Sequence, residues 1–289
     1  MSAERRFAGA IDLHTHSRVS DGTETPSELI RAARAAGLGT VALTDHDSTA
    51  GWAEASVTAR EVGITLIPGM EFSTRQGYSS VHLLAYLFDP TDAGILDETA
   101  RIREARLTRA EAMVARIGAD YGLTWEDVLA QTTPGTTIGR PHIADALVAR
   151  GLVSTRSAAF EGILHSRAGY FQPHYAPAPL HAVRLVRAAG GVPVLAHPAT
   201  RGVEGLISET LLAELVEAGL FGLELDHREN KPEGTARLAV LAERYGLFVT
   251  GSSDYHGEGK PNRLGENTTA PEVLDAIIAQ GTGSQPIYA

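Results

Sequence analysis

The chain has 289 residues, a formal net charge of -10, 43% hydrophobic residues and no cysteine. The lack of cysteine excludes disulfides, thiolate zinc sites, iron–sulfur clusters and a cysteine nucleophile, and the acidic balance argues against binding of long DNA through many phosphates. No apolar run approaches the ~20 residues that span a bilayer, and the polar N-terminus lacks the apolar core of a signal peptide, so we expect a cytoplasmic protein without a membrane partner.

The first part of the chain alternates short apolar runs with helical patterns. Proline and glycine mark the start and end of a helix that runs from Pro26 to Gly37, and a second helix is predicted over 49–62. Strands are predicted over 10–13, 40–44, 64–68 with a continuation toward 72, and 81–88.

The middle of the chain, from 97 to about 177, has helical spacing and no convincing strand. Helices are predicted over 102–117, 125–131 and 141–150, with a loop over 132–139. We interpret this segment as a helical insertion over one face of the fold. It divides the chain into a first part over 1–97, the insertion over 98–177 and a second part over 178–289.

The last part returns to alternation, with strands predicted over 191–196, 221–225 and 247–251 and helices over 180–189, 204–218, 233–245 and 271–279. Strands that alternate with helices indicate an α/β fold with a parallel sheet. About seven such strands could close into a barrel, and a doubly wound open sheet is the alternative.

Metal-binding residue types follow the predicted strands. His14 and His16 stand two apart at a strand end, so both imidazoles face the same side, and Asp21 lies just beyond. His46 follows the second strand, where Asp47 or Ser48 is also expected to cap the next helix.

Further candidates follow the later strands. Glu71 comes after the third strand, His197 follows the fifth, and Asp254 and His256 follow the last. His82 lies within an apolar run, where a histidine is more often a core residue than a ligand.

In a βα barrel the carboxyl ends of the strands meet at one face. We therefore expect a common metal site of nitrogen and oxygen ligands, which suits Mn, Fe or Zn. The nine candidates are His14, His16, Asp21, His46, Glu71, His82, His197, Asp254 and His256. Nine ligands exceed what one ion needs, so two or three divalent ions bridged by a carboxylate are predicted.

The sequence resembles the polymerase-and-histidinol-phosphatase (PHP) family. The matching segments, in the family's order, are IDLHTHSRVSDGT, ALTDHDS, IPGMEFS, VHLLAY, VLAHP and GSSDYHG. The resemblance implies a distorted seven-stranded βα barrel, here with a helical insertion. Within the family, the sequence looks most like small bacterial phosphoesterases that act on nucleotides, including 3′,5′-nucleoside bisphosphates and short RNA 5′ ends.

The resemblance also implies a distribution of the ligands over three ions. One ion would be held by His14, His16, Glu71 and Asp254. Glu71 would bridge to a second ion, bound also by His82 and His197, and a third would be held by Asp21, His46 and His256. By the same likeness Asp12 and Asp45 support the ligands.

Arg140 lies in an insert segment, Thr137 to His142, that resembles the same relatives. We interpret Arg140 as a phosphate clamp, because a guanidinium matches phosphate through two parallel hydrogen bonds. The alternative is a solvated arginine beside a helix start. Lys260 and Asn262 are further candidates for contact with substrate. His227 is the other histidine expected near the site, and His142 is expected either near the site or only near the helix start.

Divalent ions lower the pKa of bound water, so a hydroxide that bridges two ions is expected to attack phosphorus in line. Arg140, His197, Asp254 and His256 are the residues expected to act in catalysis. The predicted partner is a small phosphorylated substrate, a nucleotide or a short RNA end. Histidinol-phosphate phosphatase, a non-catalytic metal- or nucleotide-binding module, and a proofreading exonuclease acting in trans are the alternatives.

Overall fold

The apolar runs form one seven-stranded sheet in the computed structural model, which describes residues 9–289. The strands follow one another in chain order across the sheet. They are β1 (Ala10–Asp12), β2 (Leu38–Leu43), β3 (Thr65–Gln76), β4 (Ser79–Tyr86), β5 (Val192–Ala196), β6 (Gly222–Asp226) and β7 (Phe248–Gly251).

The two edge strands of this sheet meet, so the sheet closes on itself. Thr15, just after β1, forms a parallel bridge with Tyr255, just after β7. The His16 backbone N–H donates to the Tyr255 carbonyl at 2.8 Å, and the Thr269 N–H donates to the Ile11 carbonyl at 2.9 Å. The predicted α/β barrel is therefore confirmed in distorted form, and the doubly wound alternative is wrong.

The sheet is not wholly parallel, which corrects the expectation from sequence. β4 runs antiparallel to both β3 and β5, whereas the other four neighbouring pairs are parallel. The cause is the short connection at Gly77, whose φ of 58° fits a tight turn. A parallel return would need a crossover of about a dozen residues, and the chain has no room for one between Gln76 and Ser79.

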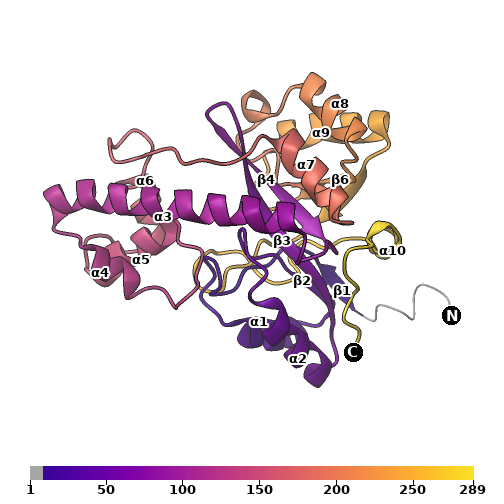
Figure 1. The fold of residues 1–289 in the computed structure, drawn as a ribbon, viewed down its shortest axis with the longest axis horizontal. Coiled ribbons are helices and arrows are strands. Elements are labelled where there is room, and N and C mark those ends of the chain that lie inside the picture. The colour runs from indigo at the N-terminus through magenta and orange to yellow at the C-terminus, as the bar shows by residue number, and fades with distance from the viewer. Residues whose placement is uncertain (1–8) are drawn as a thin grey trace.

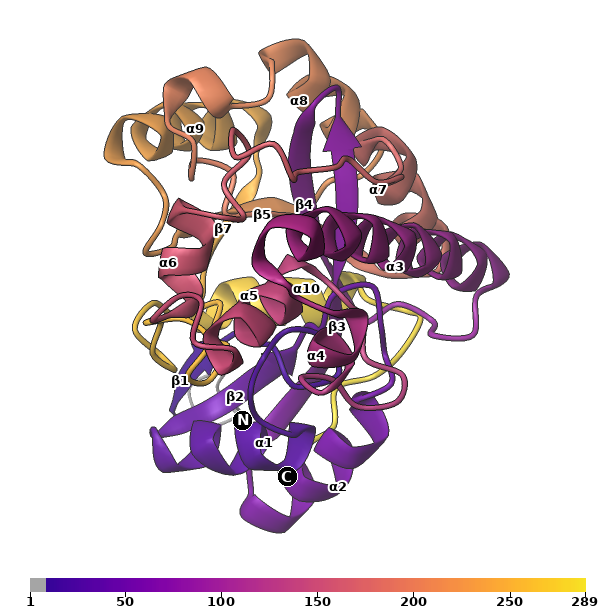
Figure 2. The ribbon, with the colours of Figure 1, turned by 90° about the vertical axis from the view of Figure 1, so that its left-hand side faces the viewer.

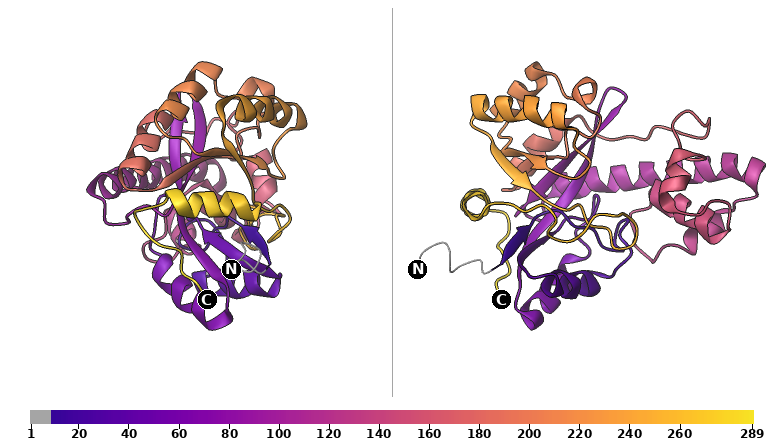
Figure 3. Two further views of the ribbon diagram at one scale, coloured as in Figure 1. Left: turned by 90° about the vertical axis from the view of Figure 1, so that its right-hand side faces the viewer. Right: turned by 180° about the vertical axis from the view of Figure 1, so that it is seen from behind.

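Six helices belong to the two outer parts of the chain: α1 (Pro26–Ala35), α2 (Trp52–Val62), α7 (Pro179–Ala188), α8 (Glu209–Glu217), α9 (Pro232–Tyr245) and α10 (Pro271–Gln280). α10 lies at the end of the barrel opposite to the insertion (Figure 3). Its Leu274 and Ile277 are fully buried in a cluster with Ile11 and Phe221, so α10 closes the amino ends of the parallel strands.

Two predicted helix starts are wrong. The helix expected over 49–62 begins at Trp52 with Gly51 as an uncapped N-terminus, and Asp47 binds Ser73 instead of capping it. The helix expected over 204–218 begins at Glu209, because the Ser208 hydroxyl accepts the Leu211 N–H and sets the cap there. Only a single 3-10 turn, Val203–Gly205, precedes it.

The insertion consists of α3 (Ala93–Tyr121), α4 (Trp125–Leu129), α5 (Arg140–Ala149) and α6 (Arg156–Glu161), the last of which sequence reasoning missed. α3 runs away from the barrel, with α4 to α6 beside its far half (Figures 1 and 2). Met113 and Ile117 of α3 pack with Ile143 and Leu147 of α5 in an apolar cluster separate from those of the barrel. The division into 1–97, 98–177 and 178–289 stays a prediction.

Among the described residues, no helix is both long and apolar enough to cross a membrane. The carboxyl ends of the parallel strands face the insertion, because α10 closes the other end. Side chains that follow these strands are thereby directed to a space between barrel and insertion.

Candidate metal centre

All nine residues predicted to bind metal come together at the end of the barrel that faces the insertion. They fall into overlapping groups in which one nitrogen or oxygen atom per residue lies within 4.8 Å of the others. The groups are His14, His16, Glu71 and Asp254; His16, Asp21 and His256; His46, Glu71 and His82; and His14, His197 and Glu224. Whether the nine bind ions stays a prediction.

The turn at the end of β3 explains how His82 joins the other eight. β4 runs in the opposite direction, so a residue early in β4 lies level with the carboxyl ends of the parallel strands. His82 pairs across the sheet with Ser73 of β3 and Ala196 of β5. A histidine inside an apolar run is thus brought beside Glu71 instead of into the core.

The backbone is strained at two candidate ligands. His197 and Asp254 have φ angles of 30° and 55°, in the left-handed region that residues with a Cβ rarely adopt. Each stands directly or shortly after a strand, where this geometry reverses the chain. Strain at such positions persists only where the surroundings impose it, and it favours a functional role for both side chains.

Glu71 is the centre of the cluster and is 1% exposed. Five imidazole nitrogens lie within 3.2 Å of its two oxygens, and they belong to His14, His16, His46, His82 and His197. His82 is nearest, with Nδ1 at 2.6 Å from Oε1. A carboxylate with imidazoles around both oxygens has the geometry to bridge two ions.

Asp254 and Asp21 complete the set from the opposite side. Asp254 Oδ1 lies 3.3 Å from His16 Nε2, while its Oδ2 lies 2.6 Å from Lys260 Nζ. Asp21 lies 3.2 Å from His256 Nε2 and 3.7 Å from His46 Nε2. All of these carboxylates are buried.

The mutual charges of the cluster decide the protonation of its members. Burial alone would raise the pKa of Glu71, but His46 and His82 hold that pKa well below its usual range. Burial alone would lower the pKa of His16, yet the carboxylates of Asp254 and Glu71, 3.3 and 3.1 Å from its Nε2, outweigh burial and raise the pKa to about 9. Without a cation, the buried carboxylates therefore favour the protonated forms of His14 and His16, whereas burial lowers the pKa of His46 and of His256.

Several buried polar atoms of the cluster have no hydrogen-bond partner among the described residues. They include Asp21 Oδ1, His46 Nδ1, Asp254 Oδ1 and His256 Nε2. Buried atoms of this kind are costly unless something satisfies them. Imidazole nitrogens and carboxylate oxygens are ligands for Mn, Fe and Zn, so the residues fit divalent transition ions.

Glu224 belongs to the cluster and was missed from sequence. Its Oε1 lies 3.0 Å from His14 Nδ1, and its Oε2 accepts the His197 backbone N–H at 2.8 Å. Burial would raise the pKa of Glu224, but His14 outweighs it and lowers the pKa to about 2. The available signal was a glutamate inside the apolar strand β6, a position that needs a buried partner.

Asp12, Asp45 and Asp47 hold the loops that carry the candidate ligands. Asp12 accepts the backbone N–H groups of Ser253 and Gly265 at 3.0 and 2.9 Å. Asp45 accepts the Ser17 N–H at 2.8 Å. None of the three is in a group that could hold an ion among the described residues.

A cavity of about 500 Å³ opens above the cluster, between barrel and insertion. Asp21, His46, His82 and His256 reach it from the barrel side. Its cationic lining residues are Arg106, Arg109, Arg140, Arg156 and Lys260, with His174 beside them. Of these, sequence reasoning had singled out Arg140 and Lys260 only.

Arg140 lies at the first position of α5, between two aromatic rings. Its guanidinium carbon is 5.2 Å from the ring centre of Phe160 and 5.5 Å from that of Phe171. Such cation–π contacts fix the plane of the guanidinium. The arginine is therefore held at the cavity wall and is not a freely solvated side chain.

The remaining polar candidates take different places. Asn262 is 3% exposed, donates to the Ser253 carbonyl at 2.7 Å and does not line the cavity. His142 caps α5 through the Gly139 N–H and contacts the Ser20 carbonyl at 2.9 Å. His227 Nε2 lies 3.4 Å from Asp254, so the expectation that it is near the site is confirmed.

Comparison with known proteins places this geometry among phosphoesterases. The PHP domain model matches residues 12–113. The 3′,5′-nucleoside bisphosphate phosphatase of Chromobacterium violaceum is 34% identical over 276 residues, which cover 92% of this chain and 94% of that protein. The 5′-3′ exoribonuclease of Haemophilus influenzae is 31% identical over 271 residues, covering 92% and 96%. A solved structure from Bifidobacterium adolescentis, described as a metal-dependent phosphoesterase, has a TM-score of 0.92 at 45% identity and covers 95% of this chain and 97% of that chain.

Proposed function

The chain belongs to the PHP domain family of metal-dependent phosphoesterases, enzymes that hydrolyse phosphoester bonds, and from this premise we propose that it removes phosphate from nucleotides. The observation that carries the proposal is the buried cluster around Glu71, opposite an arginine-lined cavity. The phosphate of a nucleotide can bind at the cluster, and its nucleoside part can bind in the cavity.

The proposed centre would hold two or three Mn, Fe or Zn ions, and Glu71 would be the carboxylate that they share. Its nine ligands would be His14, His16, Asp21, His46, Glu71, His82, His197, Asp254 and His256. When bound, such ions lower the pKa of water and neutralise phosphoryl oxygens, which is the chemistry that hydrolysis of a phosphate ester requires.

The chain's own cations would orient the phosphate. Arg140, fixed between two rings, presents N–H donors to phosphoryl oxygens. Lys260 stays protonated, because Asp254 outweighs burial and raises the pKa of the lysine. Lys260 thus supplies positive charge and not a proton.

The cavity favours a polyanionic nucleotide over histidinol phosphate, the alternative within the family. Histidinol phosphate carries an ammonium group and one phosphate, so it offers fewer anionic groups than a nucleoside bisphosphate to the five cations that line the cavity beside Asp21, Glu161 and Glu229. Relatives are named a 3′,5′-nucleoside bisphosphate phosphatase and a 5′-3′ exoribonuclease, and a nucleoside bisphosphate or the phosphorylated end of an RNA suits these cations. We propose a cytoplasmic location. The net charge of -10 favours a small substrate over long DNA, because long DNA would be repelled by an acidic protein.

The test is phosphate release by the metal-reconstituted protein. Adenosine 3′,5′-bisphosphate, AMP, a short 5′-phosphorylated RNA and histidinol phosphate are compared, with Mn, Fe and Zn in turn. We expect the nucleotides to be hydrolysed and Glu71→Gln to abolish turnover of all of them. Faster release from histidinol phosphate would favour the alternative substrate. If no ester released phosphate, the result would favour the non-catalytic metal- or nucleotide-binding module.

A further inference from the structure

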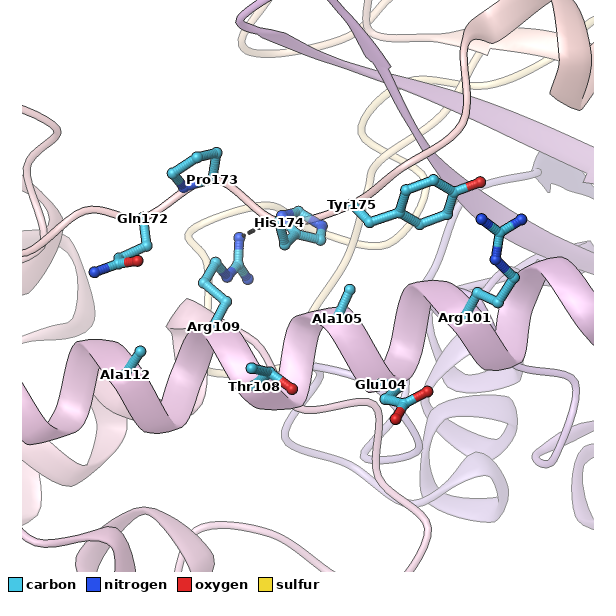
Figure 4. Close-up of a pocket in the computed structure, with 10 residues that line it drawn as sticks. All are labelled: Arg101, Glu104, Ala105, Thr108, Arg109, Ala112, Gln172, Pro173, His174 and Tyr175. Atoms are coloured by element: carbon cyan, nitrogen blue, oxygen red, sulfur yellow. Dashed lines mark hydrogen bonds between the residues drawn. The ribbon is translucent and has the colours of Figure 1, made fainter.

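One buried arginine of the insertion has no acidic partner. Arg109, on α3, is 9% exposed, and its Nη1 donates to His174 Nδ1 at 3.0 Å (Figure 4). Its Nε has no hydrogen-bond partner in the described part of the chain. Within residues 9–289, no carboxylate forms an ion pair with it.

The surroundings of Arg109 add to its charge instead of balancing it. Burial, followed by the charges of Arg106, Arg140 and Arg75, lowers the pKa of Arg109 to about 9. Three other cations of the cavity are matched: Arg106 by Asp47, Arg156 by Asp145 and Lys260 by Asp254. Arg140 has no acidic partner among the described residues, but it is only partly buried and contacts the rings of Phe160 and Phe171. Burying an unmatched charge costs free energy. An anion bound beside Arg109 would offset this cost.

His174 adds a second unused donor at the same place. Its Nδ1 accepts a hydrogen from Arg109, so the neutral ring carries its own hydrogen on Nε2. Nε2 is buried and has no partner among the described residues. Arg109 and His174 thus stand together in the cavity wall with donors that no described residue satisfies, and such donors favour an oxyanion as partner.

We propose that Arg109 and His174 bind a second phosphate group of the substrate, one that is not cleaved. This inference rests on the proposed nucleotide phosphatase activity. Both residues line the cavity above the metal centre, yet neither belongs to a group that could hold an ion. A phosphate bound there is therefore distinct from the one presented to Glu71 and its imidazoles.

The same two residues also line a second groove. This groove lies between α3 and the 172–175 segment, and includes Arg101 and Tyr175, which stack with 4.4 Å between guanidinium carbon and ring centre (Figure 4). The second phosphate can thus be the other phosphate of a nucleoside bisphosphate. It can also be the first phosphodiester of a short RNA whose next nucleotide follows the groove.

The kinetic test compares adenosine 3′,5′-bisphosphate, AMP and a 5′-phosphorylated dinucleotide as substrates of the Mn-loaded protein. Arg109→Met should reduce kcat/KM for substrates with a second phosphate, relative to AMP, by about 10- to 100-fold, as expected for a lost charge-assisted hydrogen bond. Arg109→Lys should lose less, since it keeps the charge. A relative loss on the bisphosphate alone, or on the dinucleotide alone, identifies the source of the phosphate.

The matched control is Arg103→Met, on the exposed face of α3, which should leave all three substrates unaffected. A direct readout is calorimetric titration of the metal-free protein with adenosine 3′,5′-bisphosphate, which Arg109→Met should weaken by a similar factor. Removal of an unmatched buried charge should also leave the melting temperature unchanged or higher.

Equal losses on all three substrates, or no loss on any, would overturn the second phosphate site while leaving the phosphatase proposal intact. Conversely, Arg109-dependent binding by a protein that hydrolyses none of the substrates would support the site and contradict the proposed function.

Discussion

His14 lies between two buried carboxylates, and this arrangement sets which ring nitrogen faces the centre. Glu224 accepts at Nδ1, 3.0 Å away, while Nε2 lies 3.2 Å from Glu71. A hydrogen on Nδ1 leaves the Nε2 lone pair directed at the cluster, as a metal-ligating imidazole requires. Glu224 therefore orients His14 and, through the His197 backbone N–H, a second candidate ligand.

Replacing Glu224 by glutamine should weaken metal binding without unfolding the barrel. The amide keeps the shape but loses the charge that holds the hydrogen on Nδ1. Partners of this kind are worth about 10- to 100-fold in metal affinity. The measurement is Mn affinity by titration against a competing chelator, with circular dichroism to verify the fold.

Glu217→Gln, on the exposed face of α8, provides the matched control, because it removes the same charge away from the centre. An affinity equal to that of the wild-type protein in Glu224→Gln would show that His14 is oriented by its packing alone.

At the scale of elements, one side chain ties the insertion to the barrel. Arg106 of α3 donates to Ser73 Oγ of β3 at 2.8 Å and lies 3.3 Å from Asp47, which follows β2. Asp47 in turn accepts the Ser73 backbone N–H at 2.8 Å. This buried network joins the loop of His46 to the strand of Glu71 and to the helix that carries Arg109.

Arg106→Met should destabilise the protein by about 3 to 5 kcal/mol, the usual cost of leaving one partner of a buried ion pair unmatched. Burial already raises the pKa of Asp47, and Arg106 opposes that rise. This destabilisation should be measured as a lower free energy of unfolding in urea denaturation of the metal-free protein. The double variant Asp47→Asn, Arg106→Met should recover part of this loss, because no unmatched charge remains.

Arg103→Met serves here as the control for helix propensity, since it places the same residue on the solvent face of α3. A similar loss in both variants would mean that the network contributes nothing specific to stability.

The sequence predicts those parts of the fold that depend on local patterns. Apolar runs identified all seven strands, and Pro26 marked its helix start correctly. The direction of β4 was missed because it depends on the length of a turn, not on the composition of the strand. Arg109 and His174 stand 65 residues apart, and their contact arises only when the 172–175 segment folds back along α3. Glu224 was missed for the same reason, since only tertiary packing places it against His14.

At the scale of the whole molecule, the barrel closes around a core that is apolar at one end and charged at the other. α10 seals the apolar end, while the opposite end gathers buried carboxylates and imidazoles. Protons and metal ions compete for these imidazoles. The stability of the whole chain should therefore depend on pH in opposite ways with and without metal.

In the metal-free protein, the melting temperature should fall as pH rises from 6.5 to about 9. The pKa of His16 is about 9 in the folded state, because the nearby carboxylates of Asp254 and Glu71 outweigh burial, against an ordinary value of 6.5. A folded-state pKa raised above the unfolded value gives stability that is complete below pH 6.5 and lost as pH rises through 9. Asp21, Glu71 and Asp254 do not contribute to this slope, because their pKa values are lowered and they stay ionised throughout.

With Mn bound, the slope over the same window should vanish or reverse, because a ligating imidazole must be deprotonated and metal affinity grows as protons leave. The measurement is the melting temperature at half-unit pH steps for chelated and Mn-loaded samples of one preparation. Lysines and tyrosines that titrate near pH 9 affect both samples alike, so the difference between the two curves isolates the centre. Parallel curves would mean that His16 keeps its proton when Mn is present and is not a ligand, whereas curves that diverge above pH 6.5 would place Mn and the protons on the same nitrogens.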